Sequence, residues 1–205
     1  MSADERPERN ASRWANYYKI REGGQPRETV LKALALYGDE SGQAIDLGCG
    51  NGNDTLALLE AGWHVLAIDG QAEAIERVRA NTPAEWRPRL QTQVAMFETL
   101  TLPPADLINA SFALPFCPPE YFTRFGGQIV GSIRPHGRFA GQLFGNKDSW
   151  AGRPEMTCHT RAQVDELLAG FEIEFLVEDY DPDGRTAVGN PKHWHIYRIV
   201  ARKRG

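Results

Sequence analysis

The chain has 205 residues, of which 41% are hydrophobic and 24% charged, and its formal net charge of −4 and its length fit one globular domain over residues 1–205. Because binding to a phosphate backbone needs clustered Lys and Arg side chains, this charge argues against nucleic acid as a partner. The three cysteines lack metal-like or disulfide spacing, and no stretch resembles a signal peptide or a membrane span, so we expect a cytoplasmic protein without a metal or a membrane partner.

Residues 1–40 precede the first expected strand, and we expect this segment to cover a ligand pocket. Trp14, Tyr17 and Tyr18 lie close together within it, and packing of these rings against the edge of a sheet is the alternative. Residues 29–37 have the apolar spacing of a helix, and Gly38 is placed to end it.

Strand-like and helix-like stretches alternate through the rest of the chain, which predicts a mostly parallel α/β sheet. The short turn at 181–184 makes the last strand antiparallel to the strand before it. Asn53 or Asp54 is expected to cap the first of these helices, and Pro135-His136-Gly137 to end the one that opens near Pro118. The expected strands are 43–47, 63–68, 90–95, 106–112, 138–144, 171–180 and 193–201, and the expected helices are 54–62, 71–80, 118–133 and 161–169.

A glycine-rich turn follows the first strand, in the stretch Asp46-Leu47-Gly48-Cys49-Gly50-Asn51-Gly52. The next strand ends in a second carboxylate, Asp69, and the whole unit is typical of a nucleotide-like ligand site. A dinucleotide site would have a third glycine where this chain has Asn53, and a phosphate loop would end in Gly-Lys-Ser/Thr, which does not follow this turn. Both features argue against a phosphate-bearing ligand. The carboxylate of Asp46 is a poor neighbour for a pyrophosphate and a good one for a cation.

This pairing of an acidic strand end, a Gly-x-Gly-x-Gly turn and a second acid resembles the signature of class I S-adenosylmethionine-dependent methyltransferases. The resemblance implies a Rossmann-like fold for residues 41–205, with a seven-stranded, mostly parallel sheet, an antiparallel last strand and helices on both faces. It also implies S-adenosylmethionine as cofactor and S-adenosylhomocysteine as product. In size and layout the chain is similar to the compact small-molecule members, including the tellurite-resistance and thiol enzymes.

The resemblance further implies which residues contact the cofactor. The glycines would let the backbone approach the methionine part of the cofactor. Asp46 would act electrostatically on the ammonium group of that part, and Asp69 would accept hydrogen bonds from the ribose hydroxyls. Residues after the third strand would line the adenine, although Met96 departs from the small polar residue that is common there, and Phe97 has a place in the core as its alternative. The implied cofactor set is Asp46, Gly48, Cys49, Gly50, Gly52, Asp69, Gly70, Met96, Phe97 and Asn109.

A small-molecule acceptor is favoured over nucleic acid, because Asn109-Ala110-Ser111-Phe112 lacks the prolines of amino-methylating nucleic-acid enzymes. The expected acceptor residues are Tyr17, Arg27, Phe112 and Trp150, in an apolar and aromatic pocket.

No catalytic residue is assigned, because in-line methyl displacement mainly needs a close, aligned and dry nucleophile. The candidates are Tyr18, His159 at a helix N-terminus facing the site, and His193, which would share a strand face with His195. The alternatives to an enzyme of this class are a non-catalytic S-adenosylmethionine-binding regulatory module and an NAD-linked oxidoreductase. We expect a monomer or a homodimer.

Overall fold

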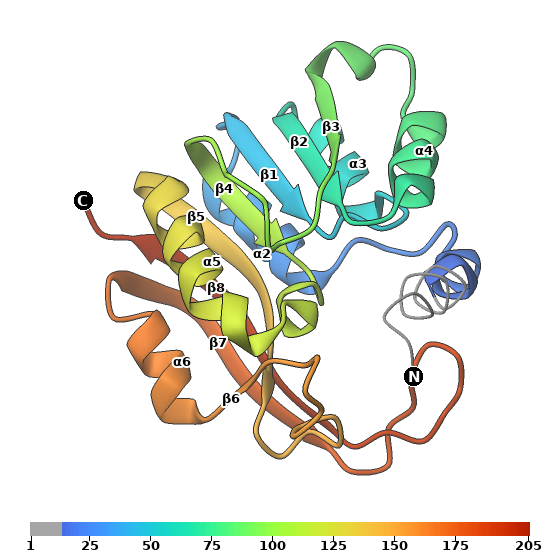
Figure 1. Ribbon diagram of the computed structural model, residues 1–205. Helices are drawn as coiled ribbons and strands as arrows, with labels where there is room; N and C mark the ends of the chain where they lie inside the picture. Colours follow the sequence, from blue (N-terminus) through green and yellow to red (C-terminus); the bar gives the residue numbers. More distant parts are fainter. Residues whose placement is uncertain (1–13) are drawn as a thin grey trace.

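A computed structural model describes residues 14–205 and shows one twisted sheet with helices on both faces (Figure 1). The strand order is β3-β2-β1-β4-β5-β8-β7, and the short β6 pairs with β5. The strands are β1 (Gln43–Leu47), β2 (His64–Asp69), β3 (Leu90–Val94), β4 (Ala105–Ala110), β5 (Ile133–Gly145), β6 (Cys158–His159), β7 (Phe171–Asp181) and β8 (Trp194–Lys203).

Within residues 14–205, one α-helix precedes the first strand, four further α-helices and two short 3-10 helices lie between strands, and residues 14–20 are also helical. The α-helices are α2 (Glu28–Tyr37), α3 (Asn53–Glu60), α4 (Ala72–Asn81), α5 (Pro119–Ser132) and α6 (Arg161–Leu167), and the 3-10 helices are η1 (Arg87–Arg89) and η2 (Leu114–Phe116). Among the described residues, no helix is long and apolar enough to cross a membrane.

The expected fold is confirmed, with the two-residue β6 as an addition to the seven predicted strands. All pairs are parallel except those of β8, which runs antiparallel to both β5 and β7. One face of the sheet packs against α5 and α6 through a large apolar cluster. The other face packs against α2, α3 and α4 through two smaller clusters. Apolar residues at alternating positions of a strand therefore pack against the helices on opposite faces of the sheet.

Two expected boundaries are wrong. Gly52, rather than Asn53 or Asp54, is the N-cap of α3, with φ of 84°, and no side chain of the described residues caps this helix. β5 begins at Ile133, so Pro135-His136-Gly137 lies within a strand rather than after a helix. The register between β4 and β5 shifts there, and an added Cβ at Gly137 would lie 2.7 Å from the Asp106 carbonyl oxygen. The tripeptide is thus a bulge that lets the strand continue.

The strand order reverses between β1 and β4, and Asp46 lies opposite Asn109 in this pair. The turns that leave two such neighbouring strands run to opposite sides of the sheet, which opens a crevice at their carboxyl ends. The fold thereby places the glycine turn and the end of β4 at one site.

A buried ion pair fastens the chain that enters β8 to the loop after β5. The Lys192 side chain is fully buried, it pairs with Asp148, and its Nζ lies 4.1 Å from the ring centre of Trp150 and 4.3 Å from that of Trp194. Burial lowers the pKa of Lys192, and Asp148 opposes that shift. Aromatic faces and a carboxylate both stabilise a cation away from water.

Replacing Lys192 by Ala should lower the free energy of unfolding by about 3–5 kcal/mol, because Asp148 would remain as a buried charge without its partner. Urea unfolding followed by tryptophan fluorescence or circular dichroism measures this loss. Lys32→Ala is the matched control, because Lys32 and Glu28 form an exposed pair on α2 that should contribute less than about 1 kcal/mol. Equal losses in the two variants would contradict the assignment.

Candidate functional site

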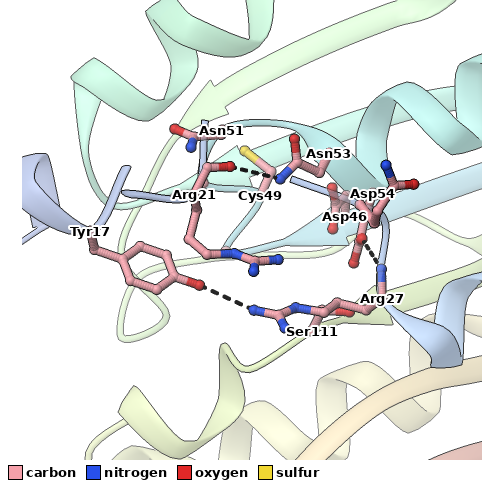
Figure 2. Close-up of a pocket in the computed structure, with 12 residues that line it drawn as sticks. Tyr17, Arg21, Arg27, Asp46, Cys49, Asn51, Asn53, Asp54 and Ser111 are labelled. Carbon is pink, nitrogen blue, oxygen red and sulfur yellow. Dashed lines mark hydrogen bonds between the residues drawn. The ribbon is translucent and has the colours of Figure 1, made fainter. Parts of the chain in front are cut away.

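A small cavity of about 60 Å³ lies at the carboxyl ends of β1 and β4, under the N-terminal segment (Figure 2). Its floor comes from the glycine turn and the start of α3, and its cover comes from residues 17–27. The lining residues are Tyr17, Arg21, Gln25, Arg27, Asp46, Gly48, Cys49, Gly50, Asn51, Asn53, Asp54 and Ser111.

The glycine turn is shaped by left-handed backbone and by a close neighbour. Gly48, Gly50 and Gly52 all have positive φ, which L side chains rarely adopt. A Cβ added to Gly48 would lie 2.5 Å from the Ala113 Cβ, so no larger residue fits there. The N–H groups of Gly48 and Cys49 donate to the Ile68 carbonyl at 2.8 and 3.0 Å, which ties the turn to β2.

Two buried carboxylates form the acidic floor of the cavity. The Asn109 amide donates to Asp46 Oδ1 at 2.8 Å and to Asp54 Oδ2 at 3.0 Å, and the Thr55 hydroxyl donates to Asp46 Oδ2 at 2.5 Å. Burial first, and then the charge of Asp54, raises the pKa of Asp46 from 3.8 to about 7. This floor favours a positively charged group above it.

The Asp69 carboxylate lies beside the turn and is fixed by backbone groups. It accepts from the Gly50 N–H at 3.0 Å and from the Gln71 N–H at 2.9 Å, and the Tyr18 hydroxyl donates to it at 3.3 Å. Burial raises the pKa of Asp69. Burial and the Asp69 charge also raise the pKa of Tyr18, so this hydroxyl stays protonated and acts as a donor.

The covering segment is attached to the same turn by polar contacts. The Asn51 amide donates to the Tyr18 carbonyl, and the Asn53 amide donates to the Arg21 carbonyl at 3.2 Å. Asn51 Oδ1 is buried and has no hydrogen-bond partner within the described part of the chain. An acceptor left in this state beside a cavity suits a ligand that carries donor groups.

Several predicted site residues meet at this cavity. Asp46, Gly48, Cys49 and Gly50 line it together with Tyr17 and Arg27, which were expected on the acceptor side. Asp69 and Asn109 lie directly behind that lining through the hydrogen bonds just described, and Gly52 caps α3. Their individual roles remain predictions.

The expected adenine-side residues do not line the cavity. Met96 is 52% exposed, and its sulfur would meet a Cβ placed on Gly70 at 2.6 Å, so it lies over that glycine. Phe97 stacks on Phe125 at 4.9 Å between ring centres and packs against the main core, which was the alternative for this residue.

Phe112 and Trp150 lie in an aromatic cluster next to the cavity rather than in its lining. Phe112 has φ of 54°, and its ring lies 6.4 Å from that of Trp194, which in turn lies 5.9 Å from Trp150. Phe144 at the end of β5 contacts all three rings. These aromatic side chains form a wall that continues from the cavity toward the Lys192 pair.

Neither histidine candidate reaches the cavity. His159 does not face the site: it is buried against Phe122, with 4.6 Å between ring centres, and burial lowers its pKa to about 4, so it is neutral. His193 precedes β8 and is exposed, whereas His195 is buried and contacts Glu178, so the expected shared face of the two histidines is wrong.

Sequence reasoning missed part of the lining: Arg21, Gln25, Asn51, Asn53, Asp54 and Ser111. Asp54 carried a signal, because an acid in the first turn of a helix after a glycine turn points back toward that turn. Arg21 and Gln25 carried none, since only the folded position of the cover shows which of its side chains turn inward.

Comparisons with known proteins agree with this geometry. Residues 44–137 match a family model described as a methyltransferase domain. A trans-aconitate 2-methyltransferase from Azoarcus sp. (strain BH72) is 31% identical over 114 residues, which cover 54% of this chain and 42% of that protein. The chain therefore spans less than half the length of this curated relative.

Two solved structures share the fold. TehB from Haemophilus influenzae superposes with a TM-score of 0.73 at 16% identity, over 87% of this chain and 62% of that one. The 1,6-didemethyltoxoflavin-N1-methyltransferase of Burkholderia thailandensis, solved with bound 1,6-didemethyltoxoflavin and S-adenosylhomocysteine, superposes with a TM-score of 0.63 at 20% identity, over 100% of this chain and 92% of that one. The matched domain and the shared fold confirm the predicted resemblance to S-adenosylmethionine-dependent methyltransferases.

The stability difference between the wild type and Asp46→Asn should depend on pH. Because the pKa of Asp46 is raised on folding, the wild type gains this contribution in full below about pH 4 and loses it as pH rises toward 7. The variant cannot ionise at this position, so relative to the variant the wild type should weaken between pH 4 and 7 and stay level above. Urea unfolding of both proteins across this range measures it, and a wild-type advantage that grows with pH would contradict the assignment.

Proposed function

We propose that this protein transfers a methyl group from S-adenosylmethionine to a small-molecule acceptor. The observation that carries the proposal is the glycine turn set between the buried Asp46–Asp54 pair and the backbone-fixed Asp69, at the strand-order reversal. The molecules in the names of these relatives, trans-aconitate and 1,6-didemethyltoxoflavin, are small and support this acceptor class.

The site residues fit such a cofactor by charge and by donor–acceptor chemistry. The ammonium and sulfonium groups are cations, and Asp46 and Asp54 provide negative charge at the floor. The two backbone bonds to Asp69 hold its oxygens in place, so a ribose hydroxyl can take the position that the Tyr18 hydroxyl holds here. The orphaned Asn51 Oδ1 offers one more acceptor beside the turn.

When bound, S-adenosylmethionine would supply a methyl group on a positively charged sulfur. An acceptor atom would attack the methyl carbon in line, and the sulfur would leave with the bonding electrons as a neutral thioether. The contribution of this chain is to orient the two partners and to exclude water. Among the described residues that line the cavity there is no imidazole, and burial raises the pKa values of Tyr18 and Cys49, so neither of these two groups is ionised near neutral pH.

The cover must open for this reaction. Small-molecule sites usually enclose about 300–1,000 Å³, whereas the cavity has about 60 Å³. The Tyr18 side chain fills the space beside Gly50, where a Cβ added to Gly50 would lie 3.6 Å from the Tyr18 ring. The Tyr18 hydroxyl also donates a hydrogen bond to the Asp69 carboxylate. We infer that the segment of residues 14–27 moves outward to admit the cofactor and then closes over it.

The decisive experiment incubates the protein with methyl-labelled S-adenosylmethionine and a panel of thiols, phenols, carboxylates and oxyanions, and follows the label. A labelled small molecule supports the proposal. Label found only in DNA or protein would overturn the acceptor class. Cofactor binding without product from any acceptor would favour the regulatory module, and tighter binding of NAD would favour the oxidoreductase.

Replacing Asp69 by Ala should weaken S-adenosylhomocysteine binding by at least about 1 kcal/mol, or roughly fivefold, because hydrogen bonds to a charged acceptor are lost. Isothermal titration calorimetry measures the dissociation constant. Asp39→Ala is the matched control, since Asp39 is exposed just after α2. Unchanged affinity in the Asp69 variant would mean that this acid does not hold the ribose.

Replacing Tyr18 by Phe should tighten S-adenosylhomocysteine binding about 2- to 10-fold. The variant lacks the hydroxyl that donates to Asp69, and this hydrogen bond must break before the cofactor binds. A net hydrogen bond stabilises the closed, cofactor-free state by about 0.5–1.5 kcal/mol. Tyr121→Phe on α5 serves as the control, measured by the same calorimetry. Weaker binding would instead make the Tyr18 hydroxyl a cofactor contact.

A further inference from the structure

Arg27 is held in place from both ends at the cavity wall (Figure 2). Its backbone N–H donates to Asp54 Oδ1 at 2.8 Å, just before α2 begins at Glu28. Its guanidinium carbon lies 4.6 Å from the centre of the Phe112 ring, and its Nη2 lies 3.4 Å from the Tyr17 hydroxyl. A guanidinium stacked in this way on an aromatic face has lost most of its conformational freedom before any ligand arrives.

No carboxylate within residues 14–205 lies within the 4.0 Å ion-pair distance of the Arg27 guanidinium. The acids of the cavity floor are already engaged, because all four oxygens of Asp46 and Asp54 accept hydrogen bonds from other groups. Arg138 shows the contrast, since both ends of its guanidinium fork donate to Glu174 at 2.7 and 2.8 Å.

Arg21 adds a second guanidinium that points into the same cavity (Figure 2) and that likewise has no carboxylate at ion-pair distance in the described part of the chain. Two guanidinium groups at one cavity repel each other, and an anion that lies between them offsets this repulsion. The planar donor fork of arginine matches a carboxylate, which can accept two parallel N–H bonds.

We propose that Arg27, supported by Phe112 and Tyr17, is a carboxylate-binding subsite of this cavity. The inference rests on the function proposed above. The carboxylate has two possible sources: the amino-acid end of the cofactor or an anionic group of the methyl acceptor. In either case Arg27 positions its ligand through a bidentate contact, and Tyr17 adds a hydroxyl at the side of the same carboxylate.

The first arm of the test measures binding of S-adenosylhomocysteine and of 5′-methylthioadenosine, which keeps the nucleoside and the thioether but lacks the amino-acid part. The proteins are the wild type, Arg27→Gln, Arg27→Lys and the control Arg204→Gln, whose arginine is exposed after β8. If the cofactor supplies the carboxylate, Arg27→Gln should lose at least tenfold in affinity for S-adenosylhomocysteine and keep its affinity for 5′-methylthioadenosine. Lys should rescue only part of the loss, because it lacks the fork.

The second arm uses protein saturated with S-adenosylhomocysteine and titrates citrate, succinate and benzoate against succinamide and benzamide. If the acceptor supplies the carboxylate, the acids should bind the wild type at least tenfold more tightly than the amides, and Arg27→Gln should remove this preference. The Arg204→Gln protein should behave as the wild type in both arms.

The subsite is overturned if Arg27→Gln changes neither the discrimination between the two nucleosides nor the preference for acids over amides. Binding of 5′-methylthioadenosine reports on the proposed function separately, because that ligand has no carboxylate. Failure of both S-adenosylhomocysteine and 5′-methylthioadenosine to bind the wild-type protein would overturn the cofactor assignment and, with it, this subsite, whereas binding of 5′-methylthioadenosine to Arg27→Gln shows that the variant is folded.

Discussion

The hydrogen bonds from Asn109 to two buried carboxylates hold the site together. One amide group bridges Asp46 at the end of β1 and Asp54 at the start of α3, across the point where the strand order reverses. Burial first, and then repulsion from the charge of Asp54, makes the ionised form of Asp46 costly, and both raise its pKa. The bridging amide offsets part of this cost and keeps negative charge directly under the glycine turn.

Asp54 and Asp69 fix the cover to the core. Asp54 uses its remaining oxygen to accept the Arg27 N–H, and Asp69 accepts the Tyr18 hydroxyl. The N-terminal segment therefore rests on the groups proposed to contact the cofactor. If the cofactor binds these acceptors as proposed, closing of the cover and binding of the ligand are energetically linked rather than independent events.

Local physical chemistry explains what could be predicted from the sequence. Gly48, Gly50 and Gly52 were placed in a turn because only glycine adopts positive φ without strain, and all three do so. The strands were located within a few residues by their apolar runs. The start of β5 was missed because Pro135 and Gly137 are helix-ending residues in isolation, and the bulge that accommodates them depends on pairing with β4.

The lining of the cavity was only partly predictable, for a different reason. Residues adjacent to the turn in sequence, such as Asp46 and Gly50, were located correctly because the backbone places them directly. Arg21 belongs to a segment whose distance from the turn is set by tertiary contacts alone. For His159 the position at a helix start was right, but packing against Phe122 turned its ring away from the cavity.

The reversed direction of β8 has a practical consequence for anyone who wants to attach a reporter or a surface linker. Because β8 runs antiparallel to β5, its last residues lie beside the beginning of β5 and β7, at the edge of the sheet opposite the cavity (Figure 1). A fluorophore joined after Gly205 would sit far from the ligand. One joined ahead of the helix of residues 14–20 would be attached to the element that carries Tyr17 and Tyr18, and its signal would test the proposed opening of the cover.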